Sequence, residues 1–422
     1  MANMSALVEK DMPVTAKSET ATAPKFALFI ISFVFFMWGF VTCLNDILIP
    51  HLKAVFTLTY FQSGLIQFAF FGAYFVFSLP AGKVVSGIGY KKSISLGLLI
   101  AAAGAAMFYP AAEFQSFNAF LAALFILAAG ITFLQVAANP YVTLLGDQST
   151  ASSRLNLTQA LNSLGTTIAP AFGSMLILTS AAEVASPLEH ANSVKGPYLF
   201  LTGVLIALAV AIYIIRLPEN PNQNSSADKN ADHGTVLDVL KHRHVLLAVI
   251  GLFLYVGAEV SIGSFLVNYI SMPNIGNMDE KAAASYVPLY WGGAMVGRFL
   301  GSWVLRKLDA GRVLGFAAIV ATALCALGVV LQGNLAIWAV VSIGLFNSIM
   351  FPTIFSLGVQ GLGAQTERAS SVLIMAIVGG ALLPLLMGGM ADSIGLQLAM
   401  ILPAVCYVYI AYFGFKGSRV QA

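Results

Sequence analysis

The sequence predicts an all-α membrane protein with twelve transmembrane helices in two six-helix halves. Of its 422 residues, 59% are hydrophobic and only 9% are charged, whereas a soluble domain carries about 25% charged residues. A membrane span needs about 20 apolar residues. Apolar runs of helical length cover residues 26–52, 60–87, 92–111, 117–146, 154–180, 196–216, 245–270, 283–307, 312–332, 334–360, 368–391 and 395–415.

Polar segments divide the chain. The first apolar run is too long for the apolar core of a signal peptide, so it is expected to be a retained span. A stretch rich in Asn, Asp, Ser and Lys separates the sixth run from the seventh, as is typical of a linker. We expect a cytoplasmic tail over 1–25, a six-helix half over 26–216, a cytoplasmic linker over 217–244, a second six-helix half over 245–415 and a cytoplasmic tail over 416–422.

Basic residues predict the orientation in the membrane. With both termini inside, the cytoplasmic stretches hold seventeen Lys and Arg residues. The outside loops then hold three, Lys53, Lys195 and Lys281. Because cytoplasmic loops carry an excess of Lys and Arg, this distribution predicts cytoplasmic termini.

The two halves repeat one another at a nearly constant spacing. Pro140 and Pro352 are 212 residues apart, and the acids Asp46 and Glu259, each in the first run of its half, are 213 apart. Other pairs at this spacing are Gly146 with Gly358, Arg154 with Arg368, and Gly165 with Gly379. Parallel repeats of six helices are typical of transporters that bind their substrate near the midplane, between the halves.

The two acids are the strongest candidates for a functional site. An ionised carboxylate at the centre of a spanning helix costs roughly 2.5–3.5 kcal/mol on insertion scales, so such residues are usually functional. A carboxyl group can hydrogen-bond a hydroxyl in either protonation state. We therefore interpret Asp46 and Glu259 as cation-coupling and substrate-binding residues. The alternatives are a structural hydrogen bond for Asp46 and, for Glu259, a pair with a basic residue that holds the halves together.

Four longer motifs carry a resemblance to a known family. They are Leu44–Pro50, Ala137–Thr143, Arg154–Ser163 and Phe351–Gly358. These segments resemble the fucose:proton symporter family of the major facilitator superfamily, and the similarity runs along nearly the whole chain. The resemblance implies a multi-pass importer of the bacterial inner membrane that carries sugar with a cation. It also implies that the acid at Asp46 lines the cavity and takes part in proton coupling.

The sequence departs from the family pattern in two places. Fucose carriers have a glutamate in the fourth helix where this chain has Gln135, while Glu259 is added in the seventh. This resembles the glucose/galactose or amino-sugar branch, so the expected substrate is a hexose such as glucose or galactose, or an amino sugar. The loop over 82–92 also lacks the acidic residue that is usual in the superfamily, so it does not support the usual charge-based gate.

Neutral amides are the next candidates for sugar contacts. Gln135 and Asn139 are four residues apart, and Gln159 and Asn162 are three apart, so each pair shares a helical face. Amides donate and accept hydrogen bonds, which suits a polyol. The alternative is contact between helices or, for Asn139, satisfying backbone freed by the following proline. Further intramembrane amides with the same two interpretations are Asn45, Gln67, Asn268 and Asn347.

Aromatic rings are candidates because sugar rings have apolar faces. Trp38 lies eight residues before Asp46, Tyr255 lies four before Glu259, and Trp291 lies in the eighth run. We include all three in the predicted substrate site. Arg298, also in the eighth run, is interpreted as a gate on the cytoplasmic side or a contact to lipid headgroups.

The sequence does not predict an enzyme. It contains neither a phosphate-binding loop nor a His-Glu-x-x-His motif. We expect no cofactor, no nucleic-acid partner and a monomer in the lipid bilayer that binds sugar and a coupling cation. H⁺ is the first interpretation of that cation. Na⁺ at a site near Asp46 or Glu259 is the alternative, because carboxylate and amide oxygens suit hard cations. The same pattern is compatible with a facilitated uniporter, a drug exporter or a non-transporting sugar sensor.

Overall fold

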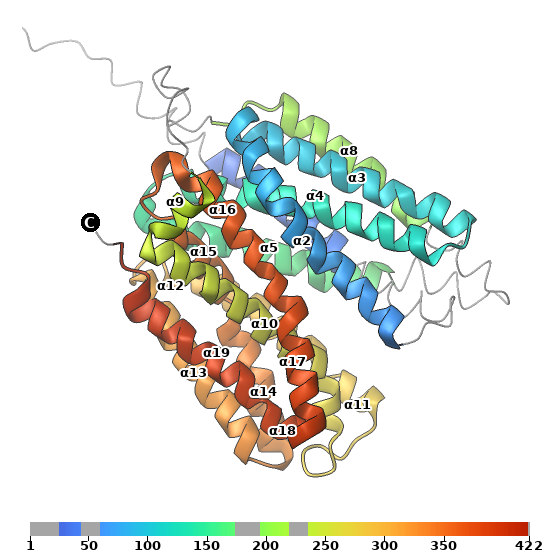
Figure 1. The fold of residues 1–422 in the computed structure, drawn as a ribbon, viewed down its shortest axis with the longest axis vertical. Coiled ribbons are helices and arrows are strands. Elements are labelled where there is room, and N and C mark those ends of the chain that lie inside the picture. The colour runs from blue at the N-terminus through green and yellow to red at the C-terminus, as the bar shows by residue number, and fades with distance from the viewer. Residues whose placement is uncertain (1–24, 44–59, 174–194, 219–234, 421–422) are drawn as a thin grey trace, which may run out of the picture.

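The structure is a computed structural model that describes residues 25–43, 60–173, 195–218 and 235–420, without the side chains of 60–65, 67 and 170–173. Within these ranges the chain is almost entirely helical (Figure 1). Ten helices of the described residues are long and apolar enough to cross a membrane. All twelve predicted runs contain helix in their described parts. The predicted all-α membrane fold is therefore confirmed.

The first half of the chain forms one packed group of helices. They are Lys25–Cys43, α2 (Tyr60–Ile88), α3 (Tyr90–Glu113), α4 (Phe117–Leu144), α5 (Ala151–Gly173) and α8 (Lys195–Ile214). The α3 helix packs against α4 and α8, and α2 packs against α4. Glycines make the α3–α4 contact close: a Cβ added at Gly104 would lie 2.3 Å from the Leu127 nitrogen. Small residues at helix contacts are typical of membrane bundles.

The second half forms another packed group. Its helices are α10 (Arg243–Ser271), α11 (Glu280–Ala284), α12 (Val287–Val304), α13 (Ala310–Val330), α14 (Gly333–Asn347), α15 (Met350–Gly358), α16 (Thr366–Met375), α17 (Gly379–Ile394), α18 (Leu396–Ala399) and α19 (Ile401–Tyr412). The α10 helix packs on α17 and α19, and α14 packs on α12 and α13.

Two predicted runs are interrupted helices in the structure. The run over 334–360 is divided into α14 and α15 by the break at Ser348 and Ile349, and the run over 368–391 contains a 3-10 turn, Ala376–Val378, between α16 and α17. Pro352 lies in the first turn of α15. Because proline has no N–H, the Ser348 carbonyl four residues earlier has no helical partner.

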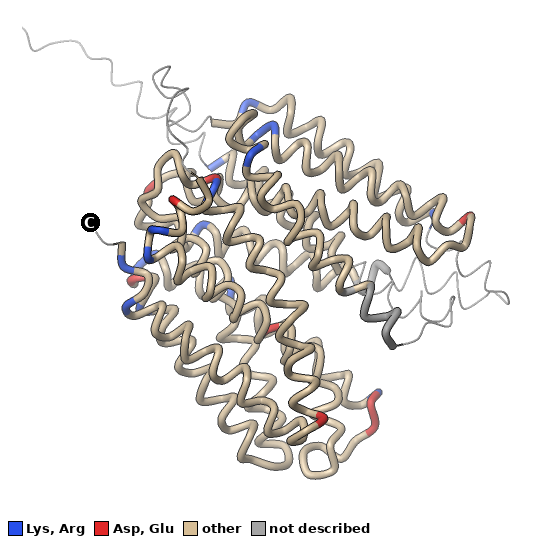
Figure 2. The backbone as a smooth tube through the Cα atoms, in the orientation of Figure 1, with Lys and Arg blue, Asp and Glu red and all other residues tan. Residues whose placement is uncertain are grey.

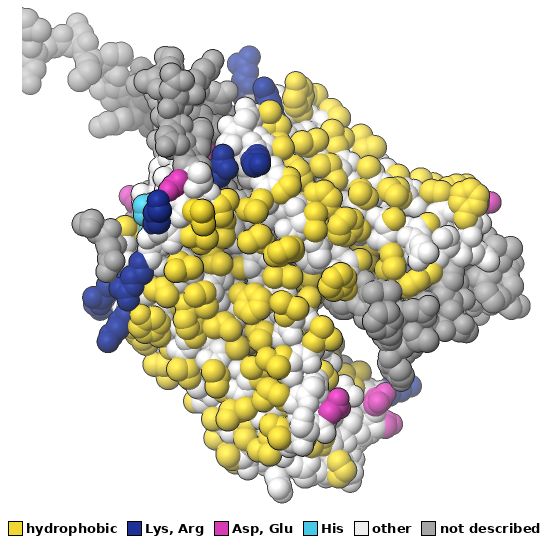
Figure 3. All heavy atoms as spheres, in the orientation of Figure 1, with side chains coloured by type: hydrophobic (Ala, Val, Ile, Leu, Met, Phe, Trp, Pro, Cys, Tyr) yellow, Lys and Arg dark blue, Asp and Glu magenta, His cyan; other side chains and the backbone are white. Residues whose placement is uncertain are grey.

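The two groups of helices meet at one end and diverge towards the other. Figure 1 shows α16 and α5 where the groups meet, and α11 at the end where they diverge. Most of the described Lys and Arg residues lie at the end where the groups meet (Figure 2). Figure 3 shows apolar side chains spread over the visible sides of both groups. An apolar outer face is what helices in contact with lipid require.

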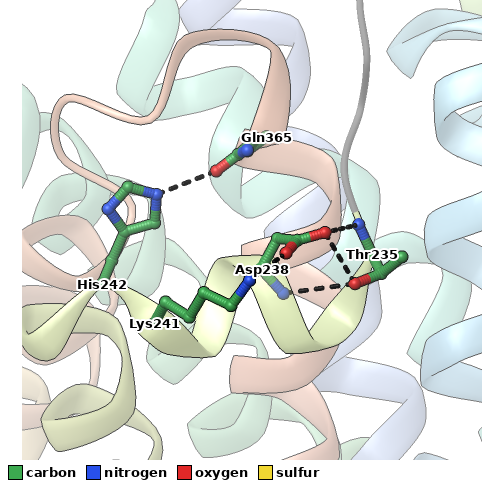
Figure 4. Close-up of polar contacts among 5 residues, drawn as sticks. All are labelled: Thr235, Asp238, Lys241, His242 and Gln365. Carbon is green, nitrogen blue, oxygen red and sulfur yellow. Dashed lines mark hydrogen bonds and ion pairs between the residues drawn. The ribbon is translucent and has the colours of Figure 1, made fainter.

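A short helix precedes α10 at the basic end and packs against α10 and α16. In α9 (Val236–Lys241), Thr235 and Asp238 form a reciprocal capping box (Figure 4). Lys241 Nζ also lies 2.7 Å from Asp238 Oδ1, and this hydrogen bond, with those from Thr235, lowers the pKa of Asp238. The next residue, His242, places Nε2 2.9 Å from Oε1 of Gln365, just before α16. A hydrogen bond therefore connects the segment before α10 to the start of α16.

We expect Gly104→Val to destabilise the fold by about 1–3 kcal/mol, because the added carbons overlap the α4 backbone. The measurement is the thermal denaturation midpoint of the purified protein in mild detergent. The matched control is Gly203→Val in α8, where an added Cβ meets nothing within 4 Å. Equal midpoints for the two variants would contradict the close α3–α4 packing.

Candidate substrate and coupling site

Glu259 occupies a polar cluster inside the second group of helices. It lies near the middle of α10, and its Oε1 atom is buried without a hydrogen-bond partner among the described residues. The Tyr290 hydroxyl of α12 is 3.5 Å from the Glu259 carbonyl oxygen. Arg298, two turns further along α12, is close enough for its charge to interact with the Glu259 carboxylate. The structure thus places this predicted coupling acid among polar groups.

The break between α14 and α15 supplies backbone acceptors to the same cluster. Tyr255 donates its hydroxyl to the Asn347 carbonyl at 3.1 Å, and Arg298 Nε donates to the Ser348 carbonyl at 3.1 Å. Asn347 Nδ2 also donates to the Tyr290 hydroxyl at 2.9 Å, while its Oδ1 is buried and unbonded within the described part of the chain. Tyr255 and Asn347, both predicted from sequence, therefore lie beside Glu259 in one hydrogen-bonded network.

Gln135 lies at the centre of a smaller polar site in the first group. Its Nε2 atom donates to the Tyr74 hydroxyl of α2 at 2.8 Å. Its Oε1 atom is buried and has no partner among the described residues. The amide is therefore oriented by Tyr74, with one acceptor available to a ligand.

The amides of α5 lie against the first helix and the second group. Asn162 Nδ2 donates to the Phe35 carbonyl at 2.9 Å, which supports the packing interpretation for this residue. The contact is close because a Cβ at Gly39 would lie 2.1 Å from the Asn162 carbonyl oxygen. Gln159 Nε2 is buried and unbonded within the described ranges, and its carbonyl accepts from Arg298. Gln159 therefore retains a donor for a ligand.

Asn139 is fully buried beside the contact between the groups. Neither side-chain amide atom has a partner among the described residues. The following residue, Pro140, frees the carbonyl of Val136, and Ser370 of α16 donates its hydroxyl to that carbonyl at 2.8 Å. The backbone freed by the proline is thus satisfied by Ser370 rather than by Asn139.

Further hydrogen bonds join the groups at the basic end. Ser152 Oγ of α5 lies 2.6 Å from Ser356 Oγ of α15. Asn156 Nδ2 donates to Thr353 Oγ1 at 3.3 Å. These contacts, with Ser370 to Val136, use short neutral side chains. We refer to this set of hydrogen bonds, which join the two groups at the basic end, as the gate.

The acidic residue missing from the loop over 82–92 has a counterpart in the other half. Glu367 of α16 is 4% exposed and interacts with Tyr90 at the start of α3. A Cβ at Gly82 would lie 2.6 Å from the Ser371 Cβ, so α2 and α16 are in close contact here. The acid at this junction comes from α16, a placement that the sequence pattern does not reveal.

The remaining predicted residues occupy separate environments. The Trp38 ring is buried and tilted against Phe35, with centroids 5.1 Å apart. Trp291 is 41% exposed, and a Cβ added at Gly263, one turn after Glu259, would lie 3.0 Å from its ring. Asn268 is exposed near the end of α10. The predictions for Asn45, Asp46 and the Gln67 side chain lie outside the described residues.

Several polar residues of this region were not singled out from the sequence as site residues. They are Tyr74, Ser163, Tyr290, Ser370 and Tyr407. One signal could have found part of the set: the carbonyl four residues before an intramembrane proline needs a donor. That rule points to the Val136 and Ser348 carbonyls, although the identity of the donor depends on the fold.

The fold and this site define a membrane transport protein with two helical groups around a polar centre. The chain belongs to the Major Facilitator Superfamily, which it matches over residues 26–377. The resemblance predicted from the sequence motifs is thereby confirmed.

Close relatives are named as sugar transporters. The chain is 51% identical to a glucose/galactose transporter of Brucella abortus, over 99% of this chain and 100% of the relative. It is 46% identical to a putative glucose/galactose transporter of Helicobacter pylori, over 95% and 98% of the two chains. It is 37% identical to the L-fucose-proton symporter of Escherichia coli, over 90% of each chain.

A crystal structure of the transporter FucP in the outward conformation is also similar. It superimposes with a TM-score of 0.87 at 35% identity, over 94% of this chain and 100% of that chain. The fold of this chain is thus shared with that transporter.

We expect Ser370→Ala to weaken the gate, because the Val136 carbonyl loses its donor inside an apolar region. A loss of about 1 kcal/mol would shift the equilibrium roughly fivefold towards opening at the basic end. The measurement is the distance distribution between spin labels at Lys92→Cys and Arg306→Cys, with the native cysteines replaced.

The control for this prediction is Ser371→Ala, whose hydroxyl donates to the Arg368 carbonyl within its own helix. An open population that rises equally in both variants would contradict a specific role for Ser370.

Proposed function

We propose that this protein imports a hexose, such as glucose or galactose, together with a cation, and that the cation is H⁺. The observation that carries the proposal is the buried Glu259 carboxyl oxygen, which has no hydrogen bond among the described residues. It lies between helices of a chain that matches named glucose/galactose transporters over 95–99% of its length. An amino sugar is the alternative substrate.

The mechanism is alternating access. The hydrogen bonds at the basic end hold that side closed, while the groups diverge at the other end (Figure 1). With the basic end in the cytoplasm, as the positive-inside rule favours, this is the outward-facing state of a carrier with both termini inside. Proton binding at Asp46 and Glu259 neutralises charge in the pathway, and the halves then rock around the bound sugar.

Unbonded amide atoms are the proposed sugar contacts. Gln135 Oε1 can accept from a sugar hydroxyl, and Gln159 Nε2 can donate to one. Asn162 contributes through its side-chain oxygen, since its Nδ2 is engaged by Phe35. Trp291 of α12 is partly exposed and lies against Gly263, one turn after Glu259 in α10, and it is the proposed aromatic contact for the sugar ring.

Na⁺ coupling is the second candidate, because Glu259, Asn347 and further amides supply the hard oxygen atoms that Na⁺ prefers. The name of the L-fucose-proton symporter relative favours H⁺. We propose a monomer in the bacterial inner membrane as the functional unit.

The decisive experiment is uptake of radiolabelled glucose and galactose into proteoliposomes, with proton and sodium gradients imposed separately. We expect accumulation with the proton gradient alone. Asp46→Asn and Glu259→Gln should abolish accumulation, because a neutral amide cannot carry the proton, while exchange of sugar across the membrane persists. Accumulation driven only by sodium would overturn proton coupling, and equilibration without accumulation would identify a uniporter.

We expect Gln135→Ala to raise the KM for sugar about tenfold, because one hydrogen bond to a buried hydroxyl is worth about 1–1.5 kcal/mol. Tyr74→Phe should raise the KM only a few-fold, since Tyr74 orients the amide without touching the sugar. Initial rates of uptake against sugar concentration measure both values. A larger effect for Tyr74→Phe than for Gln135→Ala would exclude direct sugar binding by Gln135.

A further inference from the structure

Arg243 is an exposed cation in the first turn of α10, and a neutral residue of another helix holds it in place. Its Nη2 atom donates to the Tyr412 hydroxyl at the end of α19, at 2.9 Å. Neither of the two ion pairs found among the described residues involves Arg243. A guanidinium has five N–H donors, so this contact fixes the direction of the group and leaves other donors for an anionic ligand.

A wide helical turn brings a second cation to the same place. The chain continues from α19 into a π-helix, Phe413–Gly417, and such turns are frequent at functional sites. A Cβ added at Gly417 would lie 3.1 Å from Leu247 Cδ1, so this turn packs on the beginning of α10. Lys416, the residue before Gly417, is exposed. Arg243 and Lys416 therefore belong to one basic surface, which lies close to the C-terminus (Figure 2).

The neighbouring helix α13 does not cancel this charge. Its start packs on the same turn, since a Cβ added at Gly311 would lie 2.6 Å from the Gly414 carbonyl oxygen. The acid there, Asp309, accepts from the Arg312 backbone N–H at 2.9 Å and caps the helix. Because α13 adds one acid and one exposed base, the positive charge of the basic surface remains.

Exposed apolar side chains continue from the basic surface along two adjacent helices. On α10 they lie three and seven residues after Arg243, and on α19 four and seven residues before Tyr412, so each set shares a helical face with that residue. The helices pack together, and Tyr409 of α19 donates its hydroxyl to the Leu247 carbonyl of α10 at 3.1 Å. Since Arg243 and Tyr412 touch, the two faces adjoin in one apolar strip. The strip consists of Leu246, Ile250, Val405 and Val408.

We propose that the basic surface and the apolar strip together bind one anionic phospholipid, such as phosphatidylglycerol. Arg243 donates to the phosphate oxygens, Lys416 adds attraction, and the acyl chains lie along the strip. With the basic end in the cytoplasm, the site faces the inner leaflet, where anionic lipids are attracted by Lys and Arg. The bound lipid connects α10 to α19 at this end. This inference does not depend on which sugar or cation the protein carries.

The test is lipid binding by the purified full chain in mild detergent, measured by native mass spectrometry. Phosphatidylglycerol and phosphatidylcholine are added separately, and the Kd of the first bound lipid is compared. We expect phosphatidylglycerol to bind at least about tenfold more tightly. Arg243→Gln and Lys416→Gln should each reduce this preference about fivefold, the effect expected for one basic residue near an anionic lipid.

Three controls separate this site from other sources of binding. Lys92→Gln removes an exposed cation at the basic end of the first group and should leave the preference unchanged. Val408→Ser makes the apolar strip more polar without changing any charge, and should weaken the binding of both lipids. Inorganic phosphate in excess should not displace phosphatidylglycerol from the parent protein.

Four results would overturn the proposal. They are equal affinity for the two lipids, an unchanged preference in Arg243→Gln or Lys416→Gln, an equal loss in Lys92→Gln, and unchanged lipid binding in Val408→Ser. Displacement of the lipid by inorganic phosphate would also contradict it, because the site would then recognise a free anion rather than a phospholipid.

Discussion

Backbone carbonyls freed by proline inside the apolar region constrain this structure more than any other feature. Pro140 and Pro352 occupy matching places in the two halves, and each leaves a carbonyl without its helical N–H. Water cannot reach such groups in lipid, and an unsatisfied carbonyl is costly there. The donors are Ser370 for Val136 and Arg298 for Ser348. Both donors lie where the halves meet, so the side chains that satisfy the carbonyls freed by proline are also part of the contact between the halves.

The chemistry of the gate suits a contact that must open and close. Ser152 with Ser356 and Asn156 with Thr353 are neutral hydrogen bonds between short side chains. Each contributes only about 0.5–1.5 kcal/mol net, so a few of them bias an equilibrium without locking it. Buried ion pairs would instead impose a large desolvation penalty on each charge. Two charged residues also lie between the halves: Arg298, which is held by oxygen atoms from both halves, and Glu367, which interacts with Tyr90.

The two halves share a scaffold but carry different polar groups. Gly165 allows α5 to approach the Phe36 carbonyl of the first helix, and Gly379 allows α17 to approach the Phe253 carbonyl of α10 in the same way. On this common frame, the first half places the amide of Gln135 beside Tyr74. The second half places the carboxylate of Glu259 among tyrosines and Arg298. The repeated glycines therefore give the two halves similar helix contacts, while the polar side chains of the two sites differ.

The sequence by itself determined the class of fold, the repeat and several members of the polar centre. Apolar runs must become helices in lipid because only helices there satisfy their own backbone, and intramembrane acids and amides stand out because their burial is costly. The same reasoning identifies Glu259, Gln135 and Asn347 from the sequence, and helical spacing from Glu259 adds Tyr255.

Only the tertiary structure decided which partners these residues have. In the structure, Asn347 donates to the Tyr290 hydroxyl, and Asn162 donates to a backbone carbonyl of the first helix. The acid that interacts with Tyr90, at the α2–α3 junction, is Glu367 of α16. It also placed Arg298 on α5. These pairings join residues far apart in the chain, and they depend on how closely helices approach at glycines and where they break at prolines. Periodicity along one helix shows which face a side chain occupies, but it does not show which neighbouring helix that face meets.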